Sequence, residues 1–181
     1  MKHPGNREFY AYWEEKRAGA AAPERGDLEP GPVRHLLGDI FVLGYDATAG
    51  FPVRVAGTRM CALLGRDIKG QSFADLFSGG SRHDIEDIIG IVVDETLPTV
   101  AGVTAQAADG ATIPLELLLL PFSARSRTPL SLTGLLAPMD DIPARGGVAA
   151  FTLTSWRHLP QPRVLRKWAV IRGLTVYEGL R

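Results

Sequence analysis

The residue types best suited to redox, nucleophilic or metal chemistry are scarce in this sequence, which has one cysteine and four histidines among 181 residues. Cys61 lies between Met60 and Ala62 with no base beside it, and a free cysteine in such a setting is an inert small core residue. One cysteine cannot form an internal disulfide, and the histidines lack the spacing of Cys/His zinc sites. The sequence therefore predicts neither a disulfide scaffold nor a structural metal site.

Two titratable residues, His83 and Glu116, lie inside strongly patterned segments. On a helix that turns about 100° per residue, His83 falls roughly 160° from Ile85, so we expect it to face solvent. Glu116 is the one carboxylate in the apolar run 113–120. Burial in a cavity would make it a ligand anchor or a general base. The alternation of the run places it on the face opposite Leu117, so we predict a solvated or interface carboxylate on the outer face.

The sequence lacks a glycine-rich phosphate loop, a serine nucleophile elbow and a paired-carboxylate site on one predicted helix face. Transmitter, cyclase and phosphodiesterase motifs are also absent, so we predict that the protein is not an enzyme and acts by contacting another protein. The alternative is a small cone-shaped enzyme of the ketosteroid-isomerase type, with Asp75 or Glu116 as its buried base. Such folds place helices before their long strands, whereas a strand pair comes first here.

The composition is that of an ordinary globular protein, with 45% hydrophobic and 22% charged residues, and the length suits one domain with terminal segments. The formal net charge is zero, which gives the whole molecule no electrostatic drive toward nucleic acid or anionic membrane. The N-terminus lacks the apolar core of a signal peptide, and the run 113–122 is too short to span a bilayer. We therefore expect a cytoplasmic protein with no nucleic-acid partner and no integral membrane segment.

The N-terminal part, residues 1–37, is predicted to be a helical lead-in. An amphipathic helix is expected over 6–19, because three aromatic side chains share one of its faces: Phe9, Tyr12 and Trp13. Glycines and prolines interrupt regular structure over 20–32, and one more helical turn is expected at 33–37. The aromatic face of the helix requires a cover.

Residues 38–141 have the pattern of a domain that mixes strands and helices. Strands are predicted at 40–45, 51–57, 99–107, 113–120 and 130–139. Two short helices, 58–64 and 70–77, follow the first strand pair, and a longer helix begins where Ser81 and Asp84 have the spacing of a capping box. Its apolar side chains repeat at helical spacing: Ile85, Ile88, Ile89 and Val92. The pair Asp109-Gly110 predicts a tight turn between the third and fourth strands.

The C-terminal extension, residues 142–181, is basic and aromatic. Residues 145–181 contain seven Lys or Arg residues and one acidic residue, so the net charge of zero hides an extension near plus six and a preceding part near minus six. Three interpretations stay open: a structured extension packed on the domain, an arm for a partner or an anionic surface, or a disordered segment.

Residues 56–77, AGTRMCALLGRDIKGQSFADLF, contain a Leu-Leu-Gly turn that is followed by Gly70 and then by Asp75 before an apolar pair. This run resembles the corresponding segment of PAS domains. The lead-in, with Phe9-Tyr10-Ala11-Tyr12-Trp13, resembles that of the small single-PAS proteins of alphaproteobacteria, the PAS_5-type family. The resemblance covers about residues 7–141. It implies an α+β fold: a PAS-like five-stranded antiparallel sheet with helices covering one face, plus the N-terminal helix and the C-terminal extension.

PAS domains hold their ligands between the sheet and the helices, so the resemblance makes the apolar residues expected there the candidate ligand site: Leu63, Leu64, Phe73, Leu76, Ile88, Ile89, Val92, Leu117, Leu119 and Leu135. The other face of the sheet is apolar as well and needs a cover, which the N-terminal helix, the extension or a second subunit would supply. We expect an interface through the residues Phe9, Tyr12, Trp13, Leu118 and Leu120.

In flavin-binding light sensors of this fold, the reactive cysteine follows the first short helix in an Asn-Cys-Arg-Phe-Leu-Gln context. Cys61 precedes that place and lacks the context, so we expect no cofactor. The resemblance implies sensing or protein interaction, and we expect a stand-alone PAS sensor or adaptor in bacterial signal transduction, with a regulatory protein as partner and a homodimer as its assembly. Its cavity would hold a small apolar ligand or be filled by the protein's own side chains.

Overall fold

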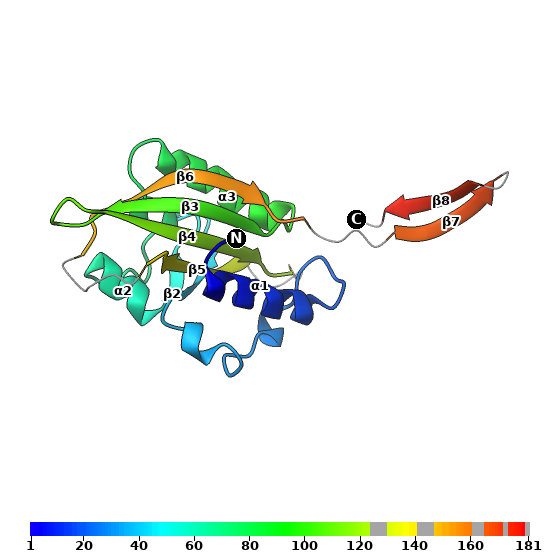
Figure 1. Ribbon diagram of the computed structural model, residues 1–181, viewed down its shortest axis with the longest axis horizontal. Coiled ribbons are helices and arrows are strands. Elements are labelled where there is room, and N and C mark those ends of the chain that lie inside the picture. The colour runs from blue at the N-terminus through cyan, green and yellow to red at the C-terminus, as the bar shows by residue number, and fades with distance from the viewer. Residues whose placement is uncertain (124–129, 141–146, 161–164, 172–173, 180–181) are drawn as a thin grey trace.

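Six strands pair into one antiparallel sheet that has helices on both faces (Figure 1). The computed structural model describes residues 1–123, 130–140, 147–160, 165–171 and 174–179. In spatial order the strands are β2 (Val53–Ala56), β1 (Ile40–Gly44), β5 (Ser131–Pro138), β4 (Thr112–Pro121), β3 (Thr99–Gln106) and β6 (Phe151–His158). The α+β, PAS-like architecture predicted from the sequence is confirmed, with one strand more than expected.

The sixth strand comes from the stretch that the sequence assigns to the C-terminal extension. Strand β6 lies at an edge of the sheet and pairs with β3, and its Phe151 also forms an isolated parallel bridge with Phe77. Its Phe151 is fully buried opposite Ala105, and Leu153 is half-buried opposite Val103, whereas the next four residues are exposed or nearly so. Two inward apolar residues are too weak a pattern to predict a strand. The first part of the extension is therefore structured and packed on the domain.

Three helices cover the inner face of the sheet: α2 (Thr58–Leu64), the short 3₁₀ helix η3 (Phe73–Leu76) and α3 (Ser81–Asp94). The four apolar positions predicted for the long helix are all buried at or below 1% exposure, so its inward face is confirmed. The predicted capping box is wrong, because Gly80 occupies the N-cap position. Ser81 instead accepts a hydrogen bond from the backbone N–H of Leu153 at 3.0 Å, which ties α3 to the edge strand β6.

Helix α1 (Pro4–Arg17) covers the outer face of the sheet, followed by the 3₁₀ turns η1 (Arg25–Asp27) and η2 (Arg34–Leu36). It ends two residues earlier than predicted, at a left-handed Ala18. Phe9 and Trp13 are 2% and 0% exposed, and they pack in the same cluster as Leu118 of β4. Of the three candidate covers for this face, the N-terminal helix is the one that the structure shows.

Tight turns set the register of two hairpins. Between β1 and β2, the Asp46 carboxylate accepts backbone hydrogen bonds from Thr48 and Ala49, both at 3.0 Å. These hydrogen bonds hold the pKa of Asp46 below its usual value, and the Ala49 N–H has the larger effect of the two. Between β3 and β4, Gly110 adopts a φ of 85°, which glycine tolerates without strain, so the turn predicted at Asp109-Gly110 is confirmed.

A second hairpin lies beyond the sheet. Strands β7 (Leu165–Ile171) and β8 (Leu174–Gly179) pair with each other in an antiparallel two-stranded sheet, which Figure 1 shows extending away from the six-stranded one. Within the described part of the chain, none of the helices has the length and apolar character needed to cross a membrane.

Candidate functional site

The residues predicted to line a ligand cavity form the centre of a packed core between the sheet and the inner helices. Seven of them are buried to 1% exposure or less in one cluster: Phe73, Leu76, Ile88, Ile89, Val92, Leu117 and Leu119. Leu64 belongs to the same cluster at 4% exposure, and Leu63 packs against it from a half-buried position. The structure therefore brings these predicted residues together.

Leu135 is the exception, and its placement corrects the prediction. It lies directly opposite Leu118 in the β4–β5 pairing, and directly opposite residues point to the same face of a sheet. Leu135 thus packs on the outer face with helix α1, and its neighbour Leu136 faces the inner core. Both faces of β5 are apolar, so the sequence alternation could not distinguish the two leucines.

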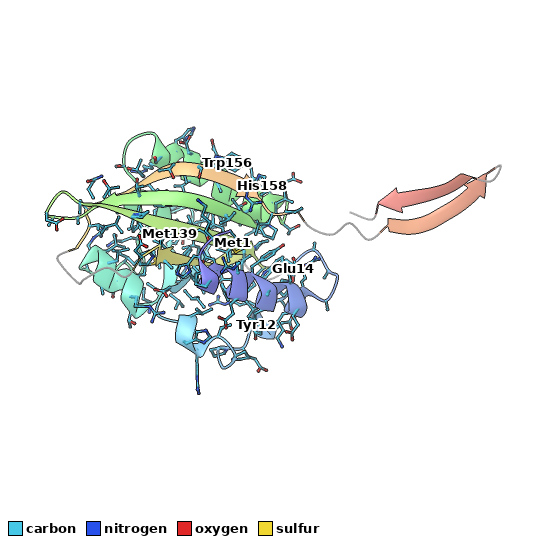
Figure 2. The ribbon with its side chains drawn as sticks, in the orientation of Figure 1. Met1, Tyr12, Glu14, Met139, Trp156 and His158 are labelled. Carbon is cyan, nitrogen blue, oxygen red and sulfur yellow. The ribbon has the colours of Figure 1, made fainter. Side chains whose placement is uncertain are left out.

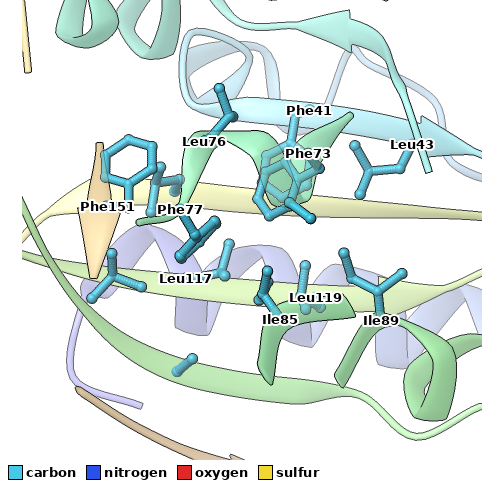
Figure 3. Close-up of a cluster of buried hydrophobic side chains, with 14 of the residues drawn as sticks. Phe41, Leu43, Phe73, Leu76, Phe77, Ile85, Ile89, Leu117, Leu119 and Phe151 are labelled. Carbon is cyan, nitrogen blue, oxygen red and sulfur yellow. The ribbon is translucent and has the colours of Figure 1, made fainter. Parts of the chain in front are cut away.

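Four phenylalanine rings occupy the space between the sheet and the helices (Figure 3). Phe41 of β1 stacks on Phe73 with a centroid distance of 4.7 Å. Phe73 contacts Phe77, and Phe77 contacts Phe151 of β6, each with centroids 5.6 Å apart. These spacings are those of rings in van der Waals contact. These four side chains fill the region where a PAS-type ligand was expected.

The predicted interface residues are buried within the chain. All five are 9% exposed or less: Phe9, Tyr12, Trp13, Leu118 and Leu120. The indole Nε1–H of Trp13 donates a hydrogen bond to the carbonyl oxygen of Pro121 at 3.0 Å. The phenol of Tyr12 donates to the Glu29 carbonyl oxygen at 3.1 Å and accepts the Glu29 N–H at 2.9 Å. As arranged here, this apolar face is already covered and presents no free surface to a partner.

Glu116 lies on the outer face, as predicted, but it is bound rather than solvated, with 7% exposure. The backbone N–H groups of Lys2 and His3 donate to its two carboxylate oxygens at 2.6 and 2.9 Å. The Asn6 amide donates to Oε1 at 3.1 Å and to the Glu116 carbonyl oxygen at 3.2 Å. Helix α1 has no acidic residue in its first turn, so a strand residue supplies the negative charge that a helix N-terminus favours.

These contacts determine the ionisation of Glu116. Burial by itself would raise the pKa of the carboxyl group, but the N–H of Lys2, the Asn6 amide, the N–H of His3 and the N-terminal charge together outweigh it. The pKa therefore lies below its usual value, which makes the group a poor proton acceptor. Asp75, the other base considered, is an exposed residue that forms an ion pair with Arg82 at 2.6 Å. Neither carboxylate has the environment that the isomerase alternative requires.

The remaining candidates for chemistry are dispersed over the described residues. Cys61 is half-buried on α2 and packs against the inner core, as predicted. His83 has an 81% exposed side chain, which confirms the solvent-facing prediction. Among the described residues, His, Cys, Asp and Glu form no group of three or more that could hold a metal ion.

A groove of about 380 Å³ lies on the outer face over β3 and β6, beside the start of the chain. Its lining includes Lys2, Gly102, Glu116 and Arg157 (Figure 2 labels Met1, Met139 and Trp156 around it). Sequence reasoning missed this groove, because it depends on β6 pairing with β3 and on the position of α1. A weak signal was present: the polar residues Thr154, Ser155 and Arg157 lie close together, around Trp156, in a segment with strand formers.

Comparison with known proteins identifies the relatives of this chain. The sequence matches the family PAS_5, described as a PAS domain, over residues 1–137, which runs from helix α1 to strand β5. No protein with a curated description matches it.

Solved structures of similar shape include the LOV protein of Rhodobacter sphaeroides, with 15% identity and a TM-score of 0.45 over 56% of this chain and 58% of that one. This chain therefore covers little more than half of that protein's length. The PAS domain of an HTR-like protein from Haloarcula marismortui has 21% identity and a TM-score of 0.44 over 60% of this chain and 90% of that one. A light-oxygen-voltage domain studied with a flavin analogue has 10% identity and a TM-score of 0.48, over 61% and 84%.

Proposed function

Because the chain belongs to the PAS_5 family of PAS domains, we propose that it is a sensor or adaptor in bacterial signal transduction that works by contacting other proteins. PAS domains are typically sensory modules rather than catalysts, which agrees with the absence of enzyme motifs from the sequence. The proposal places the protein in the cytoplasm as a homodimer that binds a regulatory protein.

The observation that carries this proposal is the filled inner core. Phe41, Phe73, Phe77 and Phe151 contact one another in a continuous row where a sensor of small molecules would keep open space. A core at native packing density leaves few voids larger than a water molecule. This favours an adaptor whose signal is a protein contact over a sensor that retains a small apolar ligand.

The exposed edge of the sheet supports self-association. On its outer side, β6 is bridged to Phe77 at Phe151 and bonded to Ser81 at Leu153. Toward its end the strand pairs with β3 alone among the described residues, and such an edge offers unpaired backbone groups to another chain. Trp156, on this strand, is a 46% exposed large aromatic residue, and tryptophan is enriched at the centre of protein interfaces. The proposed homodimer therefore uses β6 and Trp156 in place of the buried aromatic face of α1.

Native mass spectrometry of freshly purified protein, with an absorption spectrum of the same sample, tests the proposal. We expect a dimer whose subunits have the mass of the chain alone and no visible absorbance. A visible absorbance, or a mass increment from an apolar ligand that disappears on denaturation, would show a ligand retained in the core and refute the filled-core adaptor.

A pair of variants tests the surface. Trp156→Ala is expected to weaken the dimer, whereas Tyr45→Ala, which removes an aromatic side chain of the same 46% exposure from the opposite end of the sheet, is expected to leave it unchanged. Equal subunit stoichiometry for both variants in sedimentation experiments would contradict the role of β6.

A further inference from the structure

The outer face of the sheet has two halves with different chemistry. Helix α1 contacts β4 and β5 and buries the apolar half. The half over β3 and β6 stays open and contains the groove of about 380 Å³. That volume is at the lower end of the range for sites that bind small molecules. The groove is separate from the inner core, and its lining includes four residues of β6: Thr154, Ser155, Trp156 and Arg157.

A β-bulge shapes the floor of the groove. The pairing of β3 with β6 shifts between Gly102 and Val103, so Gly102 faces Ser155, Val103 faces Leu153, and Thr154 is the extra residue. A Cβ atom on Gly102 would lie 2.8 Å from both the Thr154 and the Ser155 hydroxyl oxygens. The missing side chain thus lets two adjacent hydroxyl groups converge over the strand. Bulges frequently re-aim side chains in this way beside functional sites.

The charged groups that line the groove include more unpaired positive charge than unpaired negative charge. Glu116 lines it, but both of its oxygens already accept hydrogen bonds from the N-terminal segment. Lys2 and Arg157 also line it, both exposed, and neither side chain has an ion-pair partner among the residues that the structure describes. Lys2 belongs to the acidic part of the chain, residues 1–144, and Arg157 belongs to the basic extension. An anion is therefore the ligand that the free groups favour.

Apolar side chains complete the lining. Met1 and Met139 border the groove, and Val100 and Pro114 contribute to its floor. Methionine adapts to ligands of different outline because it is unbranched and polarisable. A ligand that uses the whole groove needs an anionic end and a compact apolar body.

We propose that this groove binds a small organic carboxylate. The guanidinium of Arg157 and the ammonium of Lys2 hold the carboxylate, the Thr154 and Ser155 hydroxyls donate hydrogen bonds to it, and the apolar body lies against Met139. Arginine suits this role because its planar fork matches a carboxylate. The site does not need an empty core, and it shares Trp156 with the proposed self-association surface.

Titration of the ¹⁵N-labelled full chain with three probes tests the site. Benzoate carries the carboxylate and an apolar ring, acetate carries the charge alone, and benzyl alcohol carries the ring alone. We expect saturable binding of benzoate with amide shifts centred on Gly102, Thr104 and Ser155, and affinities at least about tenfold weaker for the other two probes. Absence of saturation by benzoate up to about 10 mM, or shifts centred elsewhere, would overturn the proposal.

Two substitutions and a control make the test specific. Arg157→Gln is expected to weaken benzoate binding about tenfold, because one charge-assisted hydrogen bond is lost. The isosteric Thr154→Val is expected to weaken it about threefold, because a neutral hydrogen bond is lost. Arg34→Gln, which removes an exposed arginine that does not line the groove, is expected to leave benzoate binding unchanged. The spectrum of each variant reports its fold directly. If Arg157→Gln and Arg34→Gln bind benzoate equally, or if acetate binds as tightly as benzoate, the assigned site is wrong.

Discussion

Replacing Glu116 with glutamine should loosen the attachment of helix α1 to the sheet. The substitution keeps the size of the side chain, but it replaces one acceptor oxygen with an NH₂ group and removes the charge. The carboxylate now accepts the N–H groups of Lys2 and His3 at 2.6 and 2.9 Å, and the Asn6 amide at 3.1 Å. In Glu116→Gln, one of the two backbone N–H groups faces another donor.

The cost follows from these contacts. A hydrogen bond to a charged group contributes about 1.5–3 kcal/mol, and a donor left unsatisfied costs about 1–3 kcal/mol. The Glu116 side chain is nearly buried while Lys2 is exposed, so water compensates part of the loss. We expect Glu116→Gln to lower the free energy of unfolding by about 2–3 kcal/mol at pH 7.

The pH dependence has a definite sign. The pKa of Glu116 is lowered in the folded protein, so its stabilising contribution is fully present above the unfolded pKa, about 4.3, and is lost as the pH falls through the folded pKa. Urea unfolding followed by tryptophan fluorescence should therefore show a wide gap between wild type and Glu116→Gln at pH 7 and a narrower one near pH 3. Glu15→Gln, on the exposed face of the same helix, should stay within about 0.5 kcal/mol of wild type. A gap of equal width at both pH values would refute the reasoning.

Three further substitutions probe the packing of the two faces. Gly134→Ala should destabilise the fold by about 3 kcal/mol, because its Cβ would lie 2.4 Å from the carbonyl oxygen of Leu118, and thermal unfolding would measure this. Trp13→Phe should cost about 1–3 kcal/mol by leaving the Pro121 carbonyl oxygen without its indole donor, as measured by urea unfolding. Leu119→Ala should cost about 2–5 kcal/mol, also in urea, because a fully buried side chain is removed from the inner core.

Each of these substitutions has a matched control. Gly31→Ala adds a Cβ where no atom lies within 4 Å, Tyr45→Phe removes the hydroxyl of a 46% exposed ring, and Leu37→Ala truncates a 41% exposed leucine. All three controls should stay within about 0.5–1 kcal/mol of wild type. A Gly134→Ala protein as stable as Gly31→Ala would mean that the sheet relaxes around the new methyl group. Likewise, the assigned contacts would be contradicted if Trp13→Phe or Leu119→Ala proved as stable as its own control.

Local patterns were sufficient for the elements that bury one clear face. Ile85, Ile88, Ile89 and Val92 repeat with helical spacing and are all buried on α3, and the aromatic stripe of α1 is buried as well. Asp109-Gly110 marks its turn because the glycine supplies a positive φ that other residues resist. In these segments the physical signal lies within a few neighbouring residues, so a single sequence carries it.

Local patterns were not sufficient to predict strand β6 or the orientation of Leu135. An edge strand needs only a few inward apolar residues, and Phe151 and Leu153 are too few to distinguish it from a loop. Leu135 lies in a strand that is covered on both faces, and a period of two cannot tell which leucine points inward when both positions are apolar. The register with Leu118 decides the face, and that register is a property of the paired strands.

The sequence by itself determined the PAS family, the order of the helices and strands as far as β5, and the opposite faces of Leu117 and Glu116. Only the tertiary structure decided that α1 covers the outer face and that Glu116 is bound by residues more than 100 positions away. It alone also placed the extension's first strand beside β3, which creates the groove. The reason is that the buried face of a helix or strand and the position of a turn depend on residues close together in the sequence. What covers a sheet face, what binds a buried charge and where a groove forms depend on which distant segments pack together.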